Sequence, residues 1–229
     1  KSTYGTGCFL MANTGKKRQN SSNKLLTTIA YQLDDVCYAL EGSIFMAGAN
    51  FQWLRDKMNF FEDVEESEEL AKKADPNANV FLIPAFVGLG APHWVPDARG
   101  AIFGLTRDAG KEELSLATHE AIAFQTKEII SSLENDGIKV DSVRIDGGLT
   151  SNAFFNQILS NVIEREVLCS KTVESTALGA AYLAGIGSGE VSLKDISKNW
   201  SPKSEYNPDS SYDLGRYDIW KEFLGRLIG

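Results

Sequence analysis

The sequence contains little cysteine and little histidine. Its 229 residues include three cysteines, Cys8, Cys37 and Cys169, and two histidines, His93 and His119. The odd number of cysteines, with no CxxC or Cys/His ligand spacing, argues against a disulfide framework and a structural zinc site. We therefore expect reduced thiols, which are typical of a cytoplasmic protein.

Long apolar runs and excess positive charge are also missing. No run reaches the roughly 18 residues that a membrane-spanning helix needs, and nothing resembles a signal peptide. Lys and Arg total 23 against 31 Asp and Glu, a net charge of −8. Such a chain is poorly suited to coat nucleic acid or an anionic membrane, so we expect neither as a partner. A small anionic ligand is not excluded, because backbone N–H groups bind phosphate without a basic surface.

The composition is that of a globular protein. Hydrophobic residues make up 43% and charged residues 24%, which excludes a disordered or fibrous chain. No internal repeat and no long linker divides the sequence, so we expect one domain over residues 1–229. The chain begins with Lys1 instead of Met and continues directly into a strand-like pattern. We therefore expect it to be part of a longer protein.

Hydrophobic patterns predict strands first, then an alternation of strands and helices. Apolar runs separated by turn residues predict an antiparallel meander over residues 4–11, 25–33 and 36–45. Further strands are expected over residues 80–86, 101–106, 140–145 and 167–170. Helical spacing predicts helices over residues 47–58, 62–73 (ended by Asp75-Pro76-Asn77), 111–134, 151–164, 175–185 and 212–228, and one that begins at Ser192. This order predicts an α/β domain with a mixed sheet flanked by helices.

Two glycine turns are the main candidate sites. Gly5-Thr6-Gly7 lets the backbone approach a ligand closely, and its Thr hydroxyl suits a phosphate, but a plain β-hairpin turn fits as well. Asp146-Gly147-Gly148 follows an apolar strand and precedes a helix, as in nucleotide sites at the carboxyl end of a sheet. The alternative is a tight turn in which Ser151 or Asn152 only caps the helix.

Three other segments carry weaker signals. Residues 175–181 are small, which is typical of a closely packed helix, either behind a ligand site or in ordinary packing against its neighbours. Residues 84–94 form a Gly/Pro loop with His93, which suits either a cleft wall or a rigid surface loop. The acidic run 62–69 is predicted to be a solvated helix face. His93 and His119 lie on different predicted elements without a Ser/Asp partner at a recognisable spacing, so no hydrolase triad is expected.

Together these segments resemble the C-terminal domain of the FGGY carbohydrate kinases, and within that family the glycerol kinases. The similarity rests on the stretches STYGTGCFLMANTG (2–15), LLTTIAY (25–31), YALEGSIFMAGANFQWLRD (38–56), PAFVGLGAPHW (84–94), ARGAIFGLTR (98–107), DGGLTSN (146–152) and STALGAAYLAG (175–185). The family belongs to the actin-like ATPase superfamily, so the resemblance implies a ribonuclease H-like α/β domain.

The resemblance also implies an activity and a set of contacts. The chain would be the nucleotide-binding half of a kinase that converts glycerol and ATP, with Mg²⁺, to sn-glycerol 3-phosphate and ADP. Within Gly5-Thr6-Gly7, Thr6 would contact a nucleotide phosphate. Gly48 and Gln52 would lie near the ribose and base, and Gly147-Gly148 with Asn152 would hold the adenosine.

Other parts of such a kinase are expected outside this chain. In the family an N-terminal domain builds most of the glycerol pocket, and the catalytic Asp precedes the stretch that begins at Lys1. We therefore name no catalytic and no metal-binding residue here, and we expect the isolated chain to be inactive. The full-length protein would be a cytoplasmic homo-oligomer, a dimer or tetramer. The alternatives are a non-catalytic nucleotide-binding or subunit-interface module, and the equivalent domain of another FGGY sugar kinase such as xylulokinase.

Three residues depart from the family pattern. His119 stands before Glu120 at a position that is usually apolar. His93 and Val95 stand where close relatives often carry Tyr and Asp. None of the three is a nucleotide position in the resemblance, so they bear on local packing or subunit contacts.

Overall fold

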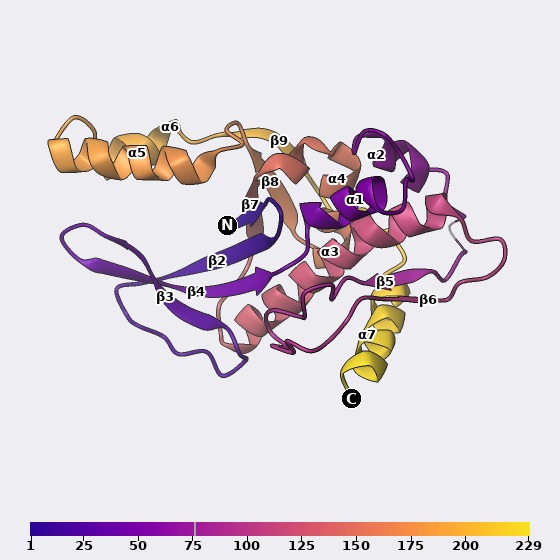
Figure 1. Ribbon diagram of the computed structural model, residues 1–229. Coiled ribbons are helices and arrows are strands. Elements are labelled where there is room, and N and C mark those ends of the chain that lie inside the picture. The colour runs from indigo at the N-terminus through magenta and orange to yellow at the C-terminus, as the bar shows by residue number, and fades with distance from the viewer. Residues whose placement is uncertain (76) are drawn as a thin grey trace.

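The centre of the molecule is a seven-stranded mixed sheet with the strand order β3-β4-β2-β1-β7-β8-β9 (Figure 1). The computed structural model describes residues 1–75 and 77–229, so Pro76 of the predicted helix break lies outside the described residues. The strands are β1 (Ser2–Tyr4), β2 (Cys8–Gly15), β3 (Leu26–Gln32), β4 (Val36–Ile44), β5 (Phe81–Ile83), β6 (Ala101–Phe103), β7 (Ser142–Asp146), β8 (Glu166–Ser170) and β9 (Pro202–Tyr206). β5 and β6 form a separate antiparallel pair. The predicted mixed α/β architecture is confirmed.

Helices follow the strands in the predicted alternation. They are α1 (Gly48–Asp56), α2 (Glu66–Ala71), α3 (Lys111–Asn135), the 3₁₀ turn η1 (Gly148–Ser151), α4 (Ala153–Ile163), α5 (Ser175–Ser188), α6 (Leu193–Asn199) and α7 (Gly215–Ile228). The Ser192 hydroxyl accepts a hydrogen bond from the Asp195 N–H at 3.2 Å. Ser192 is therefore the N-cap of α6, where the sequence predicts a helix start.

The antiparallel half of the sheet differs in detail from a sequential meander. The predicted first strand is two strands, because the chain reverses at Gly5-Thr6-Gly7 and β1 pairs antiparallel with β2. β4 then lies between β2 and β3. β4 is mostly buried, whereas Leu26 and Ile29 of β3 are 48% and 57% exposed. A largely apolar strand gains most from two neighbours, so β4 takes the inner place and β3 the edge.

β9 is the strand that the sequence did not predict. It pairs antiparallel with β8 and forms the other edge of the sheet. Its sequence, Pro-Lys-Ser-Glu-Tyr, is polar and begins with Pro202. Proline at a first position and charged side chains are typical of edge strands, which lack the apolar alternation of a half-buried strand.

α3 packs closely on the buried face of the sheet. Its start is capped by the Glu113 carboxylate, which accepts the Gly110 N–H at 2.8 Å. Along its length, a Cβ on Gly42 of β4 would lie 2.6 Å from the Ile129 side chain of α3. Glycine at residue 42 therefore lets the helix approach the strand, and α3 in turn packs on α4.

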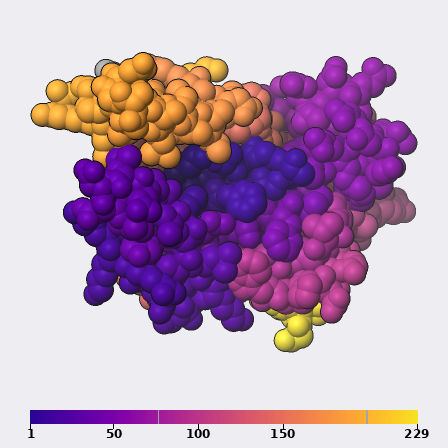
Figure 2. All heavy atoms as spheres, turned by 60° about the vertical axis from the view of Figure 1, so that its left-hand side comes forward, coloured from indigo at the N-terminus to yellow at the C-terminus, as the bar shows by residue number. Residues whose placement is uncertain are grey.

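α5 does not pack as its small residues predict. None of its described residues is buried, and Tyr182 and Leu183 are 36% and 42% exposed. Figure 2 shows this helix, in orange, projecting above the N-terminal strands. The expectation of a closely packed helix over residues 175–181 is therefore wrong within the described chain.

α7 is anchored to the core by polar contacts of buried side chains. The Arg216 guanidinium donates two hydrogen bonds of 2.7 Å to the Glu120 carboxylate of α3 and one of 2.9 Å to the Ala78 carbonyl. The Trp220 indole N–H donates to the Leu82 carbonyl at 2.9 Å. These bonds connect the C-terminal helix to both α3 and β5.

Glu128 of α3 makes a second polar connection to α7 and predicts a pH effect. Burial raises the pKa of its carboxyl, but contacts with His93 and Tyr217 outweigh burial and leave the pKa below the ordinary value of 4.5. A lowered carboxyl pKa stabilises the fold above the unfolded-state value, and this contribution is lost as the pH falls through the folded-state value. The Glu128→Gln variant should therefore melt at a lower temperature than the unsubstituted chain at pH 7, and the difference should shrink below about pH 4.5.

Thermal unfolding of both proteins at pH 7 and at pH 3 measures this difference. Glu69→Gln, at an exposed carboxylate of α2, is the matched control and should leave the melting temperature unchanged at both pH values. A difference between Glu128→Gln and the unsubstituted chain that does not vary with pH would contradict the prediction.

Cys8, Cys37 and Cys169 are free and buried, and burial raises the pKa of Cys8 to about 12. No helix in the described part of the chain is long and apolar enough to cross a membrane.

Candidate nucleotide-binding site

The β1–β2 turn and the start of α1 are joined by backbone hydrogen bonds. The Thr6 carbonyl accepts the Ala47 N–H at 2.9 Å, and the Gly5 carbonyl accepts the Gly48 N–H at 2.9 Å. A Cβ on Gly48 would lie 2.6 Å from the Gly5 oxygen. Glycine at residue 48 therefore permits the close approach that makes the turn and the helix start one unit.

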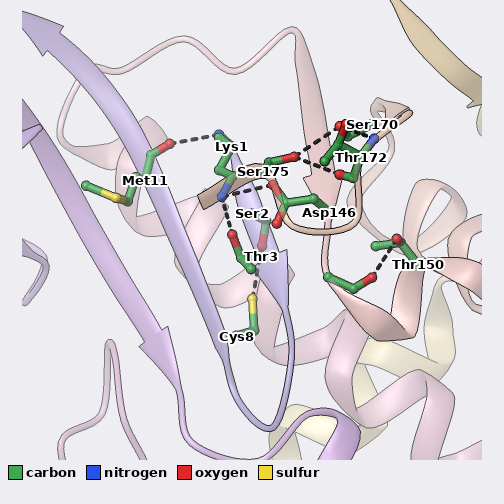
Figure 3. A network of polar contacts seen from close by, with 11 residues as sticks. Lys1, Ser2, Thr3, Cys8, Met11, Asp146, Thr150, Ser170, Thr172 and Ser175 are labelled. Atoms are coloured by element: carbon green, nitrogen blue, oxygen red, sulfur yellow. Dashed lines mark hydrogen bonds and ion pairs between the residues drawn. The ribbon is translucent and has the colours of Figure 1, made fainter. Parts of the chain in front are cut away.

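The second glycine turn follows β7 and lies beside β1. Gly147 has a φ of 96°, and a Cβ there would lie 2.3 Å from the Tyr4 carbonyl oxygen. The Thr150 hydroxyl donates to the Gly147 carbonyl at 2.7 Å and closes the turn (Figure 3). Just before the turn, the Asp146 carboxylate lies 2.9 Å from Lys1 Nζ. Parallel pairing of β1 with β7 thus places the two glycine turns next to each other.

Asn152 ends the 3₁₀ turn and starts α4. Its Oδ1 accepts the Phe155 N–H at 2.8 Å, which makes it the N-cap of the helix. Its Nδ2 lies 3.2 Å from Nε2 of His119, a residue of α3 whose side chain is fully buried. The Asn152 side chain is therefore held at both of its polar atoms.

These elements surround a cavity of about 370 Å³. Its lining consists of Gly5, Thr6, Gly48, Phe51, Gln52, Val64, Glu65, Glu68, Gly148, Leu149, Ser151 and Asn152. Its volume is in the range of about 300–1,000 Å³ that is usual for small-molecule sites. Backbone of the two turns forms one part of the wall, and apolar side chains of Phe51, Val64 and Leu149 form another. A ligand that has both polar and apolar parts fits such a lining.

The chain matches the C-terminal domain of the FGGY family of carbohydrate kinases over residues 1–188. It belongs to this family. Among its relatives, glycerol kinase of Alteromonas mediterranea is 46% identical over 99% of this chain and 47% of its own length. Glycerol kinase 1 of Clostridium tetani is 49% identical over 91% of this chain and 43% of its own length. The chain thus spans about half the length of the curated relatives it matches.

Solved structures agree with the sequence relatives. The crystal structure of Plasmodium falciparum glycerol kinase with ADP aligns with a TM-score of 0.87 and 37% identity, over 99% of this chain and 46% of that one. Xylulose kinase of Lactobacillus acidophilus aligns with a TM-score of 0.85 over 99% of this chain and 46% of that one. At 24% identity, this second likeness concerns the fold alone.

The FGGY domain brings most of the predicted nucleotide residues to one place. The predicted residues that line the cavity are Gly5, Thr6, Gly48, Gln52, Gly148 and Asn152. Gly7 and Gly147 do not line it but lie beside Thr6 and Gly148 in the two turns. Gly7 is needed for the shape of its turn, because a Cβ there would lie 2.5 Å from the Ile44 carbonyl oxygen.

The sequence patterns did not predict one wall of the cavity. Val64, Glu65 and Glu68 line it, although residues 62–69 were expected to form only a solvated face. Glu68 is 24% exposed and forms an ion pair with Lys72 at 2.7 Å. Glu65 and Glu68 are three residues apart and therefore share one helix face. Nothing in the local sequence indicates that this face meets a glycine turn.

The Gly/Pro loop of residues 84–94 lies away from the cavity lining of the FGGY domain. His93 Nε2 lies 3.2 Å from a carboxylate oxygen of Glu128, and the Trp94 indole N–H donates to the Lys24 carbonyl at 2.7 Å. Of the two readings of this segment, the structure therefore favours a rigid loop over a wall of this cavity.

Proposed function

We propose that this chain is the nucleotide-binding half of an ATP-dependent glycerol kinase, which converts glycerol and ATP to sn-glycerol 3-phosphate and ADP. The observation that carries the proposal is the single cavity that two glycine turns, the start of α1 and Asn152 line together. Glycerol kinases that are 44–49% identical to nearly the whole chain support the choice of substrate. The related Plasmodium falciparum glycerol kinase was crystallised with ADP, which supports the choice of nucleotide.

The polar and apolar parts of the cavity lining suit the polar and apolar parts of a nucleotide. Backbone N–H groups of glycine turns and the Thr6 hydroxyl are neutral donors that bind phosphate oxygens well. Val64, which is half-buried, and Leu149 offer apolar surface for a purine ring. In phosphoryl transfer most of the catalysis comes from positioning and from stabilising the charge on the transferred group. The role we assign to this chain is to hold and orient the nucleotide.

The metal ion and glycerol, the phosphoryl acceptor, are treated separately from the nucleotide. The described residues contain no group of three or more His, Cys, Asp or Glu that could hold a metal ion. We name no Mg²⁺ ligand in this chain and derive no step through a metal. We assign the glycerol pocket and the catalytic base to the rest of the kinase, and we name no catalytic residue in this chain. We also retain a single domain over residues 1–229, a cytoplasmic location and a homo-oligomeric full-length enzyme as part of the proposal.

Calorimetric titration of the 229-residue chain with ADP tests the proposed site. We expect weak binding, in the millimolar range, because the chain is about half of its relatives' length. Thr6→Ala should weaken ADP binding at least about tenfold, because it removes a hydrogen bond to a charged phosphate. Thr14→Ala, at a threonine of β2 outside the cavity lining, is the matched control and should leave ADP affinity unchanged. Equal affinity of the Thr6→Ala variant and the unsubstituted chain would contradict the site.

A further inference from the structure

His119 carries its proton on a known ring nitrogen. The side chain is fully buried on α3, and Nδ1 lies 2.8 Å from the Ser115 carbonyl oxygen. A carbonyl oxygen only accepts hydrogen bonds, so Nδ1 must be the donor. Burial lowers the pKa of His119 to about 4, so the ring is neutral at pH 7 and Nε2 has no proton.

This tautomer determines the direction of the contact with Asn152. Because Nε2 of His119 can only accept, the Asn152 atom 3.2 Å away must be the Nδ2 donor. The amide oxygen supports the same orientation, because Asn152 Oδ1 accepts the Phe155 N–H at 2.8 Å. Two independent contacts therefore select one orientation of the amide, and a flipped side chain would lose both.

The two contacts fix the polarity of the amide of Asn152, a residue that lines the cavity. Asn152 lines the cavity, and an amide nitrogen has two N–H groups, of which His119 accepts one. The second N–H remains for a ligand. The His119 ring is itself positioned by aromatic neighbours, with ring centroids 4.6 Å from Phe51 and 5.4 Å from Phe154 in edge-to-face contacts. Phe51 also lines the cavity, so His119 lies directly behind two of the lining residues.

We propose that His119 is a positioning residue of the nucleotide site, which holds the Asn152 amide so that its free N–H meets a hydrogen-bond acceptor of the bound nucleotide. The role rests on the proposed function. His119 does not line the cavity and acts through Asn152. No residue type without a hydrogen-bond acceptor at this position can hold the amide in this way.

Two substitutions of His119 separate the hydrogen bond from packing. His119→Leu keeps a side chain of similar volume and removes both ring nitrogens. His119→Gln offers an N–H for the Ser115 carbonyl and an oxygen for the Asn152 amide. We expect ADP affinity of the 229-residue chain to fall about fivefold in His119→Leu, the effect of one lost hydrogen bond. In His119→Gln the affinity should stay within about twofold of the unsubstituted chain.

A double substitution tests whether His119 acts through Asn152. Asn152→Ser retains an N-cap hydroxyl for α4 and removes the amide. In an Asn152→Ser background, His119→Leu should change ADP affinity less than about twofold, because the group that His119 holds is already gone. The side-chain amide signals of Asn152 in a ¹H–¹⁵N spectrum should also shift in His119→Leu and stay near their original positions in His119→Gln.

The outcomes distinguish this inference from the proposed function. If His119→Leu weakens ADP binding by the same factor with and without Asn152→Ser, His119 acts through packing and the positioning role is overturned. An equal loss in His119→Gln and His119→Leu overturns it as well. If the unsubstituted chain binds no ADP, the proposed nucleotide site itself fails, and the positioning role fails with it.

Discussion

Replacement of Glu120 by alanine is expected to lower the free energy of unfolding by about 3–5 kcal/mol. Glu120 is 1% exposed and its carboxylate accepts two hydrogen bonds from Arg216, which is 7% exposed. The Tyr212 hydroxyl donates a third at 2.9 Å. Removing the carboxylate leaves a buried guanidinium without its counter-charge, which costs far more than the net contribution of the pair.

Thermal unfolding of the chain should show this loss as a melting temperature lower by about 6–20 °C. The double variant Glu120→Leu/Arg216→Met should be less destabilised than Glu120→Ala, because it leaves no unpaired charge. Arg55→Met, which removes an exposed ion pair with Asp56, is the matched surface control and should leave the melting temperature unchanged. If the Glu120→Ala and Arg55→Met variants have the same melting temperature, the buried ion pair does not stabilise the packing of α7.

Gly147→Ala is expected to damage the fold and the proposed nucleotide site together. Its φ of 96° lies in a region that alanine rarely adopts, and the new Cβ would lie 2.3 Å from the Tyr4 carbonyl oxygen. Strain and overlap should cost about 3 kcal/mol or more. Because β1 must shift away from the turn, we expect ADP affinity to fall at least tenfold in the protein that remains folded.

Gly148→Ala is the matched control for Gly147→Ala. Apart from Gly148 and its two chain neighbours, no described residue has an atom within 4 Å of a Cβ built there. The melting temperature of Gly148→Ala should therefore stay close to that of the unsubstituted chain. Thermal unfolding of the two variants measures the stability difference, and calorimetry with ADP measures the loss of affinity. If Gly147→Ala melts no lower than Gly148→Ala, the close approach of the turn to β1 is not a constraint on the fold.

Local signals explain the parts of the fold that could be predicted. The Gly5-Thr6-Gly7 and Gly147-Gly148 turns are visible in the sequence because glycines at strand ends mark chain reversals and close approaches. α3 is visible because its helical spacing continues over 25 residues. β9 was missed because a short polar edge strand buries no alternating apolar face.

The candidate site was predictable only in part, because it also depends on contacts between distant segments that no local pattern shows. Glu68 has the sequence signature of a solvated helix face, and only the packing of α2 beside the glycine turns makes it a cavity wall. His119 lies within a predicted helix, but its partner Asn152 is 33 residues away. No local pattern could pair an imidazole with an amide at that separation.

The sequence by itself determined most of the helices and strands, though not β9, together with their order and the two glycine turns. Each of these depends on neighbouring residues and on backbone preferences. The tertiary structure decided that β4 lies between β2 and β3 and that the two turns meet beside β1. It also decided which nitrogen of His119 meets Asn152. These features depend on contacts between residues far apart in the chain, where burial and hydrogen-bond complementarity select one arrangement among many that the local sequence permits.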